Sequence, residues 1–204
     1  MVTLREHDVH LVDGPLHLRP MTEDDWDILL VWNNDPEVLF YSEGGDITFW
    51  SLSDMQELYR GVSQEACVFI AELNGRPIGE CWLQKMNLER VKKRYPALDV
   101  RRIDLVIGEK DCWGKGWGTR IIRLLTCFAF EQCGIDILYE PEIADYNPRS
   151  RRAFEKNGFV VEQVIPQAEG LKATVGYDMI LTREAYETHR GRESAILPPR
   201  HLHP

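Results

Sequence analysis

The stretch that most constrains the fold is residues 103–130, where two hydrophobic patterns are joined by a glycine-rich turn. Residues 103–107 read IDLVI, a β-branched apolar run typical of a mostly buried strand. From Thr119 to Phe130, apolar residues recur at helical spacing. Three glycines alternate with two other residues between these segments: Gly114, Lys115, Gly116, Trp117 and Gly118. The pattern predicts a strand, a tight turn and a helix in direct succession.

Such a turn is predicted to bind an anion. Glycines let the backbone approach a ligand closely, and the first N–H groups of the helix and its dipole favour negative charge. A phosphate or pyrophosphate is the expected ligand. The P-loop pattern does not fit, because Lys115 is followed by Gly116 where that pattern needs Ser or Thr, and the G-x-G-x-G spacing differs from the dinucleotide motif G-x-G-x-x-G. Taken alone, the loop could also be only a tight turn before a surface helix.

A second segment, residues 147–159, reads NPRSRRAFEKNGF. Together with the loop 113–118, WGKGWG, it resembles the GNAT superfamily of acyl-CoA N-acyltransferases. That family has a Q/R-x-x-G-x-G/A loop and a downstream N-x-x-[SA]-x-x-x-[YF]-E-K-x-G-F segment. Trp113 departs from the Gln or Arg at the first loop position, a tolerable change in a loop that works mainly through backbone amides. The resemblance covers approximately residues 15–182.

The resemblance implies an α/β (α+β) fold, with a mixed, twisted β-sheet and helices on both faces. Residues 1–14 are expected to be an N-terminal extension or an edge strand, and 15–182 the acetyltransferase domain. Residues 183–204 are expected to form a flexible C-terminal tail, because the hydrophobic pattern is lost there and three prolines follow Ser194.

The resemblance also implies acetyl-CoA as the cofactor. The loop amides would hold the pyrophosphate, and Lys115 would add positive charge. The central strand would pair with the pantetheine arm, and a main-chain N–H there would polarise the thioester carbonyl. Asn147 would contact this arm, cap the following helix, or do both. The cofactor residues expected on this basis are Leu105, Val106, Ile107, Trp113, Gly114, Lys115, Gly116, Trp117, Gly118, Thr119 and Asn147.

Composition limits the function. The chain has 24 Lys and Arg against 33 Asp and Glu, a formal net charge of −9, which favours cationic partners and disfavours nucleic acid, although solubility alone also explains it. No histidine lies between His17 and His189, so a carboxylate or an ordered water is the expected general base. The five cysteines form no C-x-x-C pair, and no metal site is expected. Without a membrane-length apolar run or a signal peptide, a cytoplasmic protein is expected.

The family's usual general acid is a tyrosine, but the matching position here is Phe154, which has no proton to donate. The thiolate would then leave unassisted, because it is a fair leaving group near neutral pH. Alternatively, water or another side chain supplies the proton, and the candidates are Cys112, Tyr139 and Tyr146.

Three further motifs are similar to aminoglycoside 6′-N-acetyltransferases: N-G-x-P-I-G at 74–79, R-x-I-D at 101–104 and G-K-G-x-G-T at 114–119. This resemblance implies that Asp104 contacts the reacting amine, either as proton acceptor through water or as electrostatic anchor. A salt bridge with Arg101 or Arg102 is the alternative role. The other residues expected to contact substrate are Tyr41, Glu80, Glu142 and Asp145, although the last two could be ordinary exposed acids.

The expected activity is therefore acetyl transfer from acetyl-CoA to a cationic small-molecule amine by direct attack in a ternary complex. The leading acceptor is the 6′-amine of an aminoglycoside. Two alternatives remain open: another acceptor, such as a polyamine, an amino-acid derivative or a protein N-terminus, and a binding module without turnover. A homodimer is possible, although no sequence element specifies one.

Overall fold

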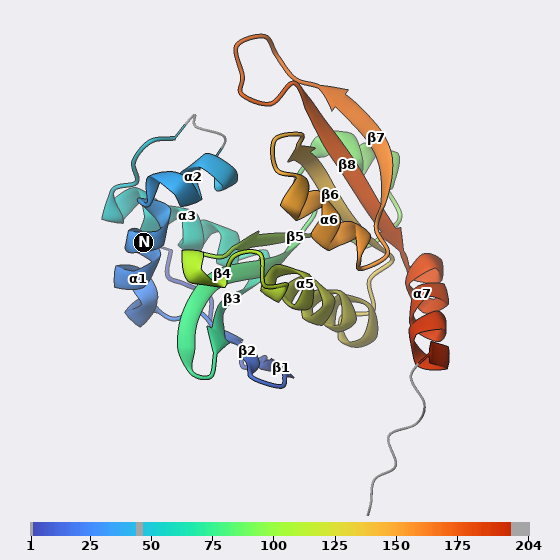
Figure 1. The fold of residues 1–204 in the computed structure, drawn as a ribbon, viewed down its shortest axis with the longest axis horizontal. Helices are drawn as coiled ribbons and strands as arrows, with labels where there is room; N and C mark the ends of the chain where they lie inside the picture. The colour runs from blue at the N-terminus through green and yellow to red at the C-terminus, as the bar shows by residue number, and fades with distance from the viewer. Residues whose placement is uncertain (1, 44–46, 197–204) are drawn as a thin grey trace, which may run out of the picture.

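The structure is a computed structural model that describes residues 2–43 and 47–196. A single sheet runs through it in the order β1-β2-β3-β4-β5-β6-β8-β7 (Figure 1). Neighbouring strands are antiparallel except β5 and β6, which are parallel, so the predicted mixed sheet is confirmed. The strands are β1 (Leu11–Asp13), β2 (Leu16–Pro20), β3 (Ala66–Leu73), β4 (Arg76–Lys85), β5 (Val100–Val106), β6 (Ile137–Ala144), β7 (Val160–Pro166) and β8 (Val175–Thr182).

Helices connect these strands and cover the sheet (Figure 1). The α-helices are α1 (Trp26–Asn33), α2 (Pro36–Ser42), α3 (Leu52–Ser63), α4 (Glu89–Arg94), α5 (Trp117–Cys127), α6 (Pro148–Glu155) and α7 (Arg183–Ile196). One turn of 3-10 helix precedes α1 at Glu23–Asp25, another lies at Lys110–Cys112, and α5 continues into a π-helix at Phe128–Gln132. In the described part of the chain, no helix combines the length and apolarity needed to cross a membrane.

The alternation of β3 explains why both sheet faces are covered. Phe69 and Ala71 belong to a core that includes α5, whereas Val68 and Ile70 belong to a core with α1 and α3. Successive side chains of a strand point to opposite faces, so an uninterrupted apolar run such as that of β3 buries both. A third core packs Val91 of α4 against the start of β5 and β6.

The parallel strands β5 and β6 stay paired over only two positions, Val100↔Ile137 and Arg101↔Leu138. Beyond Arg101 the strands separate. At that point the Glu140 side chain of β6 accepts a hydrogen bond from the Ile103 main-chain N–H of β5. This divergence leaves one edge of β5 facing a gap in the middle of the sheet.

Helices α2 and α7 were not expected from the sequence. Residues 33–36, NNDP, indicate a helix end, and α1 does end at Asn33, but the Asp35 side chain then accepts hydrogen bonds from the Glu37 and Val38 amides and starts α2. The expectation of a tail without regular structure after Thr182 is wrong for 183–196, which form α7. The remainder of that tail, 197–204, lies outside the described residues.

The contact that holds α7 is aromatic. The ring of Tyr186 stacks on Phe130 at 4.7 Å between centroids, its hydroxyl donates to Glu131, and Arg190 pairs with the same carboxylate at 2.5 Å. A single buried tyrosine on an otherwise polar helix gives little periodic signal in the sequence, although it buries a large surface.

Candidate active site

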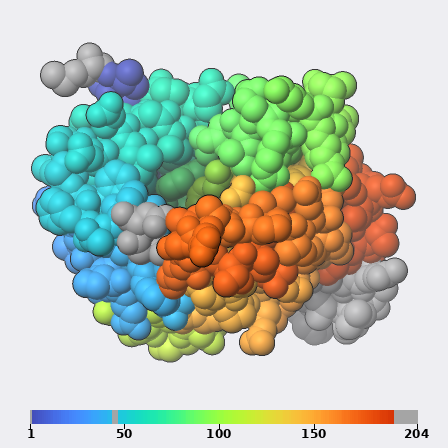
Figure 2. All heavy atoms as spheres, turned by 90° about the horizontal axis from the view of Figure 1, so that it is seen from above, coloured from blue at the N-terminus to red at the C-terminus, as the bar shows by residue number. Residues whose placement is uncertain are grey.

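A cavity of about 780 Å³ opens where β5 and β6 separate. Its walls come from α2, β4, β5 and β6, the start of α5, α6 and the connection between β7 and β8. Figure 2 shows a hollow on this side of the molecule, bordered by the segments around α3 (cyan) and α4 (green) and by the β7–β8 region (orange). We call the part lined by the glycine turn and α6 the donor half, and the part lined by α2 and β4 the acceptor half.

The donor half contains the glycine turn. Gly114, Gly116, Gly118 and Thr119 line the cavity at the start of α5. Gly114 and Gly116 have φ angles of +72° and +85°, a region that other residues rarely adopt. The neighbouring N–H groups at the first turn of α5 lack partners within the helix and suit an anionic group.

Two residues expected in this half do not line the cavity: Lys115 and Trp117. The Trp117 ring packs under the guanidinium group of Arg120, 4.9 Å from the ring centroid. The glycines of the alternating pattern therefore line the cavity with their main chain, whereas the Trp117 indole lies outside the cavity against Arg120.

The exposed edge of β5 supplies the rest of the donor half. Leu105, Val106 and Ile107 all line the cavity. The Val100 carbonyl accepts a hydrogen bond from Met86, on the β4 side. Because backbone groups alternate along a strand, those of residues 103, 105 and 107 are directed to the β6 side, where the ladder has ended. An extended ligand can therefore pair with β5 in place of a strand.

Trp113 and Asn147 complete the donor half. The Trp113 indole N–H donates to the Ile107 carbonyl at 2.7 Å and fixes the segment between β5 and the glycine turn. The Asn147 side chain accepts from the Ser150 amide at 3.2 Å, so it caps α6, and it also lines the cavity. An anion site beside an open strand edge fits the pyrophosphate and the extended pantetheine arm of acetyl-CoA.

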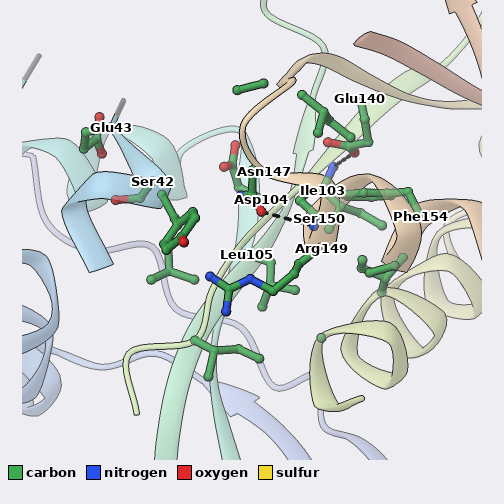
Figure 3. A pocket seen from close by; sticks show the side chains of 18 of the residues that line it. Ser42, Glu43, Ile103, Asp104, Leu105, Glu140, Asn147, Arg149, Ser150 and Phe154 are labelled. Carbon is green, nitrogen blue, oxygen red and sulfur yellow. Dashed lines mark hydrogen bonds between the residues drawn. The ribbon is translucent and has the colours of Figure 1, made fainter. Parts of the chain in front are cut away.

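Asp104 lies at the floor of the acceptor half (Figure 3). Its carboxylate pairs with Arg102 at 2.5 Å, yet 35% of the side chain is still exposed. Burial raises the pKa of Asp104, and the positive charge of Arg102 acts against that increase. The ion pair with Arg102, the alternative role considered for Asp104, is therefore present, and the residue also lines the cavity.

Glu80 is buried beside Asp104 on the neighbouring strand, with 1% of its surface exposed. Its β4 neighbour Trp82 stands directly opposite Asp104 in the register. Burial raises the pKa of Glu80 well above its usual value, and the Asp104 charge adds to this effect. The alternation of β4 therefore directs Glu80 and Trp82 to the cavity, whereas Cys81 lies in the core on the other face.

Two carboxylates at the cavity were not found from the sequence, Glu43 and Glu140 (Figure 3). Burial and the Asp104 charge raise the pKa of Glu43, at the end of α2. Burial raises the pKa of Glu140 strongly, against the charge of Arg102 and the Ile103 amide. Residues 137–140 read ILYE, and a charged residue at the end of such an apolar run could have identified Glu140 as a cavity residue. The sequence contains no comparable pattern for Glu43.

The other expected substrate residues differ in position. Tyr41 and Glu142 line the cavity, and Asp145 does not. The Asp145 carboxylate accepts hydrogen bonds from the Thr174 amide and hydroxyl, which lower its pKa. Glu142, with φ +55°, pairs with Arg90 at 3.0 Å and keeps 42% of its side chain exposed.

The side chain of Arg149 connects the two halves of the cavity. It extends from α6 and lies 4.4 Å from the ring centroid of Tyr41 and 4.9 Å from that of Trp113. Such cation–π contacts are attractive and orient the rings. Helix α2 is thereby tied to α6 across the cavity.

The structure separates the candidates for the general acid. Phe154 lines the cavity but is 5% exposed and packs against Phe159. Tyr139 is buried and its hydroxyl donates to Asp178 at 2.7 Å, outside the cavity. Cys112 is also buried outside it, and burial raises the pKa of its thiol. Of the three named alternatives, Tyr146 is the one that lines the cavity.

Comparisons with known proteins agree with this geometry. Residues 16–160 match the family model described as "Acetyltransferase (GNAT) domain". The chain is 29% identical over 178 residues to an aminoglycoside N(6′)-acetyltransferase type 1 of Klebsiella pneumoniae, covering 85% of this chain and 86% of that protein.

Solved structures show the same fold. One of AAC(6′)-Ib in complex with ribostamycin and coenzyme A has a TM-score of 0.73 and 28% identity, covering 87% of this chain and 98% of that one. A spermidine N-acetyltransferase of Vibrio cholerae, in complex with CoA and spermine, has a TM-score of 0.70 at 19% identity, covering 86% and 99%. The chain belongs to the GNAT family of acetyltransferases and is an acetyl-CoA-dependent N-acetyltransferase.

Proposed function

We propose that this protein transfers the acetyl group of acetyl-CoA to the 6′-amine of aminoglycosides. The observation that carries the proposal is the position of Asp104, a carboxylate at the cavity floor on the strand whose free edge faces the donor half. Relatives named as aminoglycoside 6′-N-acetyltransferases, at 29% identity, support the acceptor class.

The chemistry follows from the two halves of the cavity. Acetyl-CoA supplies an activated acetyl group as a thioester. The main-chain N–H groups on the free side of β5 can stabilise the negative charge that develops on the thioester oxygen. Asp104 lies one residue before the cavity-lining segment Leu105–Ile107, so an amine held by it lies close to the acyl group.

Asp104 has two tasks that oppose each other. As a carboxylate it attracts an ammonium group, but the same attraction raises the pKa of the amine and disfavours the free nucleophile. Burial resolves part of this conflict, because it raises the pKa of Asp104 and makes the carboxylate a better proton acceptor. We infer that Asp104 anchors the acceptor and takes the proton of its amine, directly or through water.

Acidic residues around Asp104 suit a polycation. Glu43 lies close enough for the Asp104 charge to raise its pKa, and Glu142 lines the same cavity with its side chain partly exposed. Several carboxylates in one cleft attract a substrate that carries several ammonium groups. This distribution supports an aminoglycoside over an acceptor with a single amine.

The decisive measurement is release of free CoA from acetyl-CoA with pairs of aminoglycosides that carry either an amino or a hydroxyl group at the 6′ carbon. Turnover is expected only with the 6′-amino member of each pair. Turnover of both members would exclude the 6′-amine as the reacting group, and turnover of neither, with tight CoA binding, would exclude the proposed acceptor.

Asp104→Asn tests the assigned residue. The expected loss in kcat/KM is about 10²–10⁴-fold, typical for removal of a general base. Asp99→Asn is the matched control, because Asp99 precedes the same strand and its carboxylate binds Arg101 outside the cavity. Full activity of the Asp104→Asn variant would contradict the role.

A further inference from the structure

Three buried polar atoms at the cavity have no hydrogen-bond partner among the residues that the structure describes. They are the Oε2 atom of Glu80, the indole Nε1 of Trp82 and the Nε of Arg102. Buried polar groups are nearly always paired in folded proteins, because an unpaired one loses its hydrogen bonds to water without gaining others. Three at one cavity therefore point to a polar ligand.

The three residues share one face of two adjacent strands. In the β4–β5 register Trp82 pairs with Asp104, and Arg102 lies two residues before Asp104 on β5. Glu80 lies two residues before Trp82 on β4. Because side chains two residues apart point to the same face, all three surround the position of Asp104.

The surroundings of Glu80 favour its protonated carboxyl group, which can donate a hydrogen bond. The side chain is fully buried, and the carboxylates of Asp104 and Glu43 face it, so a further negative charge there is disfavoured. The Tyr59 hydroxyl, from α3, is its hydrogen-bonding neighbour. Burial and the Asp104 charge raise the pKa of Glu80, which favours the protonated carboxyl group and its O–H donor.

Trp82 and Arg102 can only donate. An indole offers one N–H group and a guanidinium offers only N–H groups, and neither has an acceptor atom. A corner with these two donors beside a buried carboxyl group whose pKa is raised suits the lone pairs of an oxygen atom better than an ammonium group. The adjacent Asp104 carboxylate, in contrast, accepts hydrogen bonds and attracts an ammonium group.

We propose that Glu80, Trp82 and Arg102 form a hydrogen-bond-donating subsite that binds a hydroxyl oxygen of the acceptor, next to the amine held by Asp104. The inference rests on the proposed function and narrows it. The acceptor is an amino sugar with a ring hydroxyl close to the reacting amine, and an alkyl polyamine, which has no hydroxyl, leaves the subsite unfilled.

Three aminoglycosides test this subsite, because they share the 6′-amine and differ in ring hydroxyls. Kanamycin B has hydroxyls at 3′ and 4′, tobramycin lacks the one at 3′, and dibekacin lacks both. The measurement is kcat/KM for each, from release of free CoA. The wild-type protein is expected to prefer kanamycin B over dibekacin roughly tenfold or more, since loss of the hydroxyl leaves the donors unpaired.

Variants identify the residues responsible. Trp82→Phe removes the indole N–H but keeps an aromatic ring, and Glu80→Met removes the carboxyl group at similar length. Each is expected to bring the ratio of kcat/KM for kanamycin B to that for dibekacin towards one. Glu80→Gln keeps a neutral donor and is expected to keep the preference. Gln84→Met is the matched control, since Gln84 is the next residue on the same face of β4 and lies outside the cavity.

The outcomes separate the two proposals. Equal kcat/KM for the three acceptors in the wild-type protein would overturn the subsite and leave the proposed function standing. Turnover of none of them would overturn both. If Glu80→Gln lost the preference as fully as Glu80→Met, a charge and not a donor would be needed there, and the subsite would be wrong. Binding of CoA to each variant, measured by calorimetry, shows whether its donor half has folded.

Discussion

The carboxylate of Glu140 accepts a hydrogen bond from the main-chain N–H of Ile103 across the gap between β6 and β5. The two strands are paired only at the preceding positions, up to Arg101↔Leu138. A side chain therefore takes the place of the next ladder bond, and the strands separate without leaving the Ile103 N–H group unsatisfied. This contact stabilises the divergence that opens the cavity.

The first prediction concerns this contact. Glu140→Leu removes the acceptor of the Ile103 amide and should lower the free energy of unfolding by about 1–3 kcal/mol, the cost of a buried unpaired donor. The KM for acetyl-CoA should rise, because the cofactor is expected to bind along β5. Chemical denaturation and steady-state kinetics measure the two effects. Glu140→Gln retains an acceptor oxygen and is the matched control; equal losses in both variants would contradict this explanation.

The second prediction is a pH dependence of stability. Burial raises the pKa of Glu140 well above its value in the unfolded chain, so between the two pKa values the folded protein binds more protons than the unfolded one. This glutamate therefore makes the folded state less stable as the pH rises above about 4.3. Glu140→Gln removes the effect.

The difference in unfolding free energy between Glu140→Gln and wild type should accordingly increase from pH 5 to pH 8. Denaturant titrations at the two pH values measure it. Glu80 has the same direction of shift but is present in both proteins, so it cancels in the difference. A difference that stays constant or decreases with pH would show that Glu140 is ionised in the folded protein.

The third prediction concerns the proton for the leaving thiolate. Tyr146 lines the cavity, whereas Phe154 has no proton to donate. If Tyr146 is the acid, Tyr146→Phe should lower kcat by about 10²-fold or more. Tyr139→Phe is the control, because the Tyr139 hydroxyl donates to Asp178 away from the cavity and should affect stability alone. An unchanged kcat for Tyr146→Phe would leave unassisted departure or water as the remaining routes.

The fourth prediction uses two glycines. A Cβ on Gly79 would lie 2.2 Å from the Val106 carbonyl oxygen and 2.9 Å from the Ile107 Cα, so Gly79→Ala must push β4 and β5 apart. A loss of at least about 2 kcal/mol is expected. Gly61, in α3, has nothing within 4 Å of the added atom, and Gly61→Ala should raise stability by up to about 1 kcal/mol. Thermal unfolding of both variants checks the opposite signs.

Local patterns in the sequence predicted most of the elements that build the donor half. The IDLVI run, the glycine turn and the helix after it correspond to β5, the lining of the cavity and α5. Asn147 before Pro148 predicted the cap of α6. These features depend on residues adjacent in the chain, so turn and cap chemistry suffices to identify them.

The acceptor half depends on contacts between distant segments, and the sequence predicted less of it. The polar residues 33–36, which end α1, also contain the N-cap of α2, and α2 brings Tyr41 and Glu43 to the cavity. Asp145 is close in sequence to the cavity residue Asn147, but its carboxylate binds Thr174. Which acid faces the cavity is decided by strand register and tertiary packing, and neither follows from residue type alone.

The separation of β5 from β6 has a consequence for how acceptor preference can change. The donor half presents main-chain groups of β5 and the glycine turn, whereas the acceptor half presents side chains of α2, β4 and β5. If the proposed function is correct, substitutions at Glu43, Glu80 or Trp82 would alter acceptor recognition and preserve the backbone that faces the acyl donor. A mutant library restricted to the acceptor half would explore new amines on an unchanged acetyl-transfer scaffold.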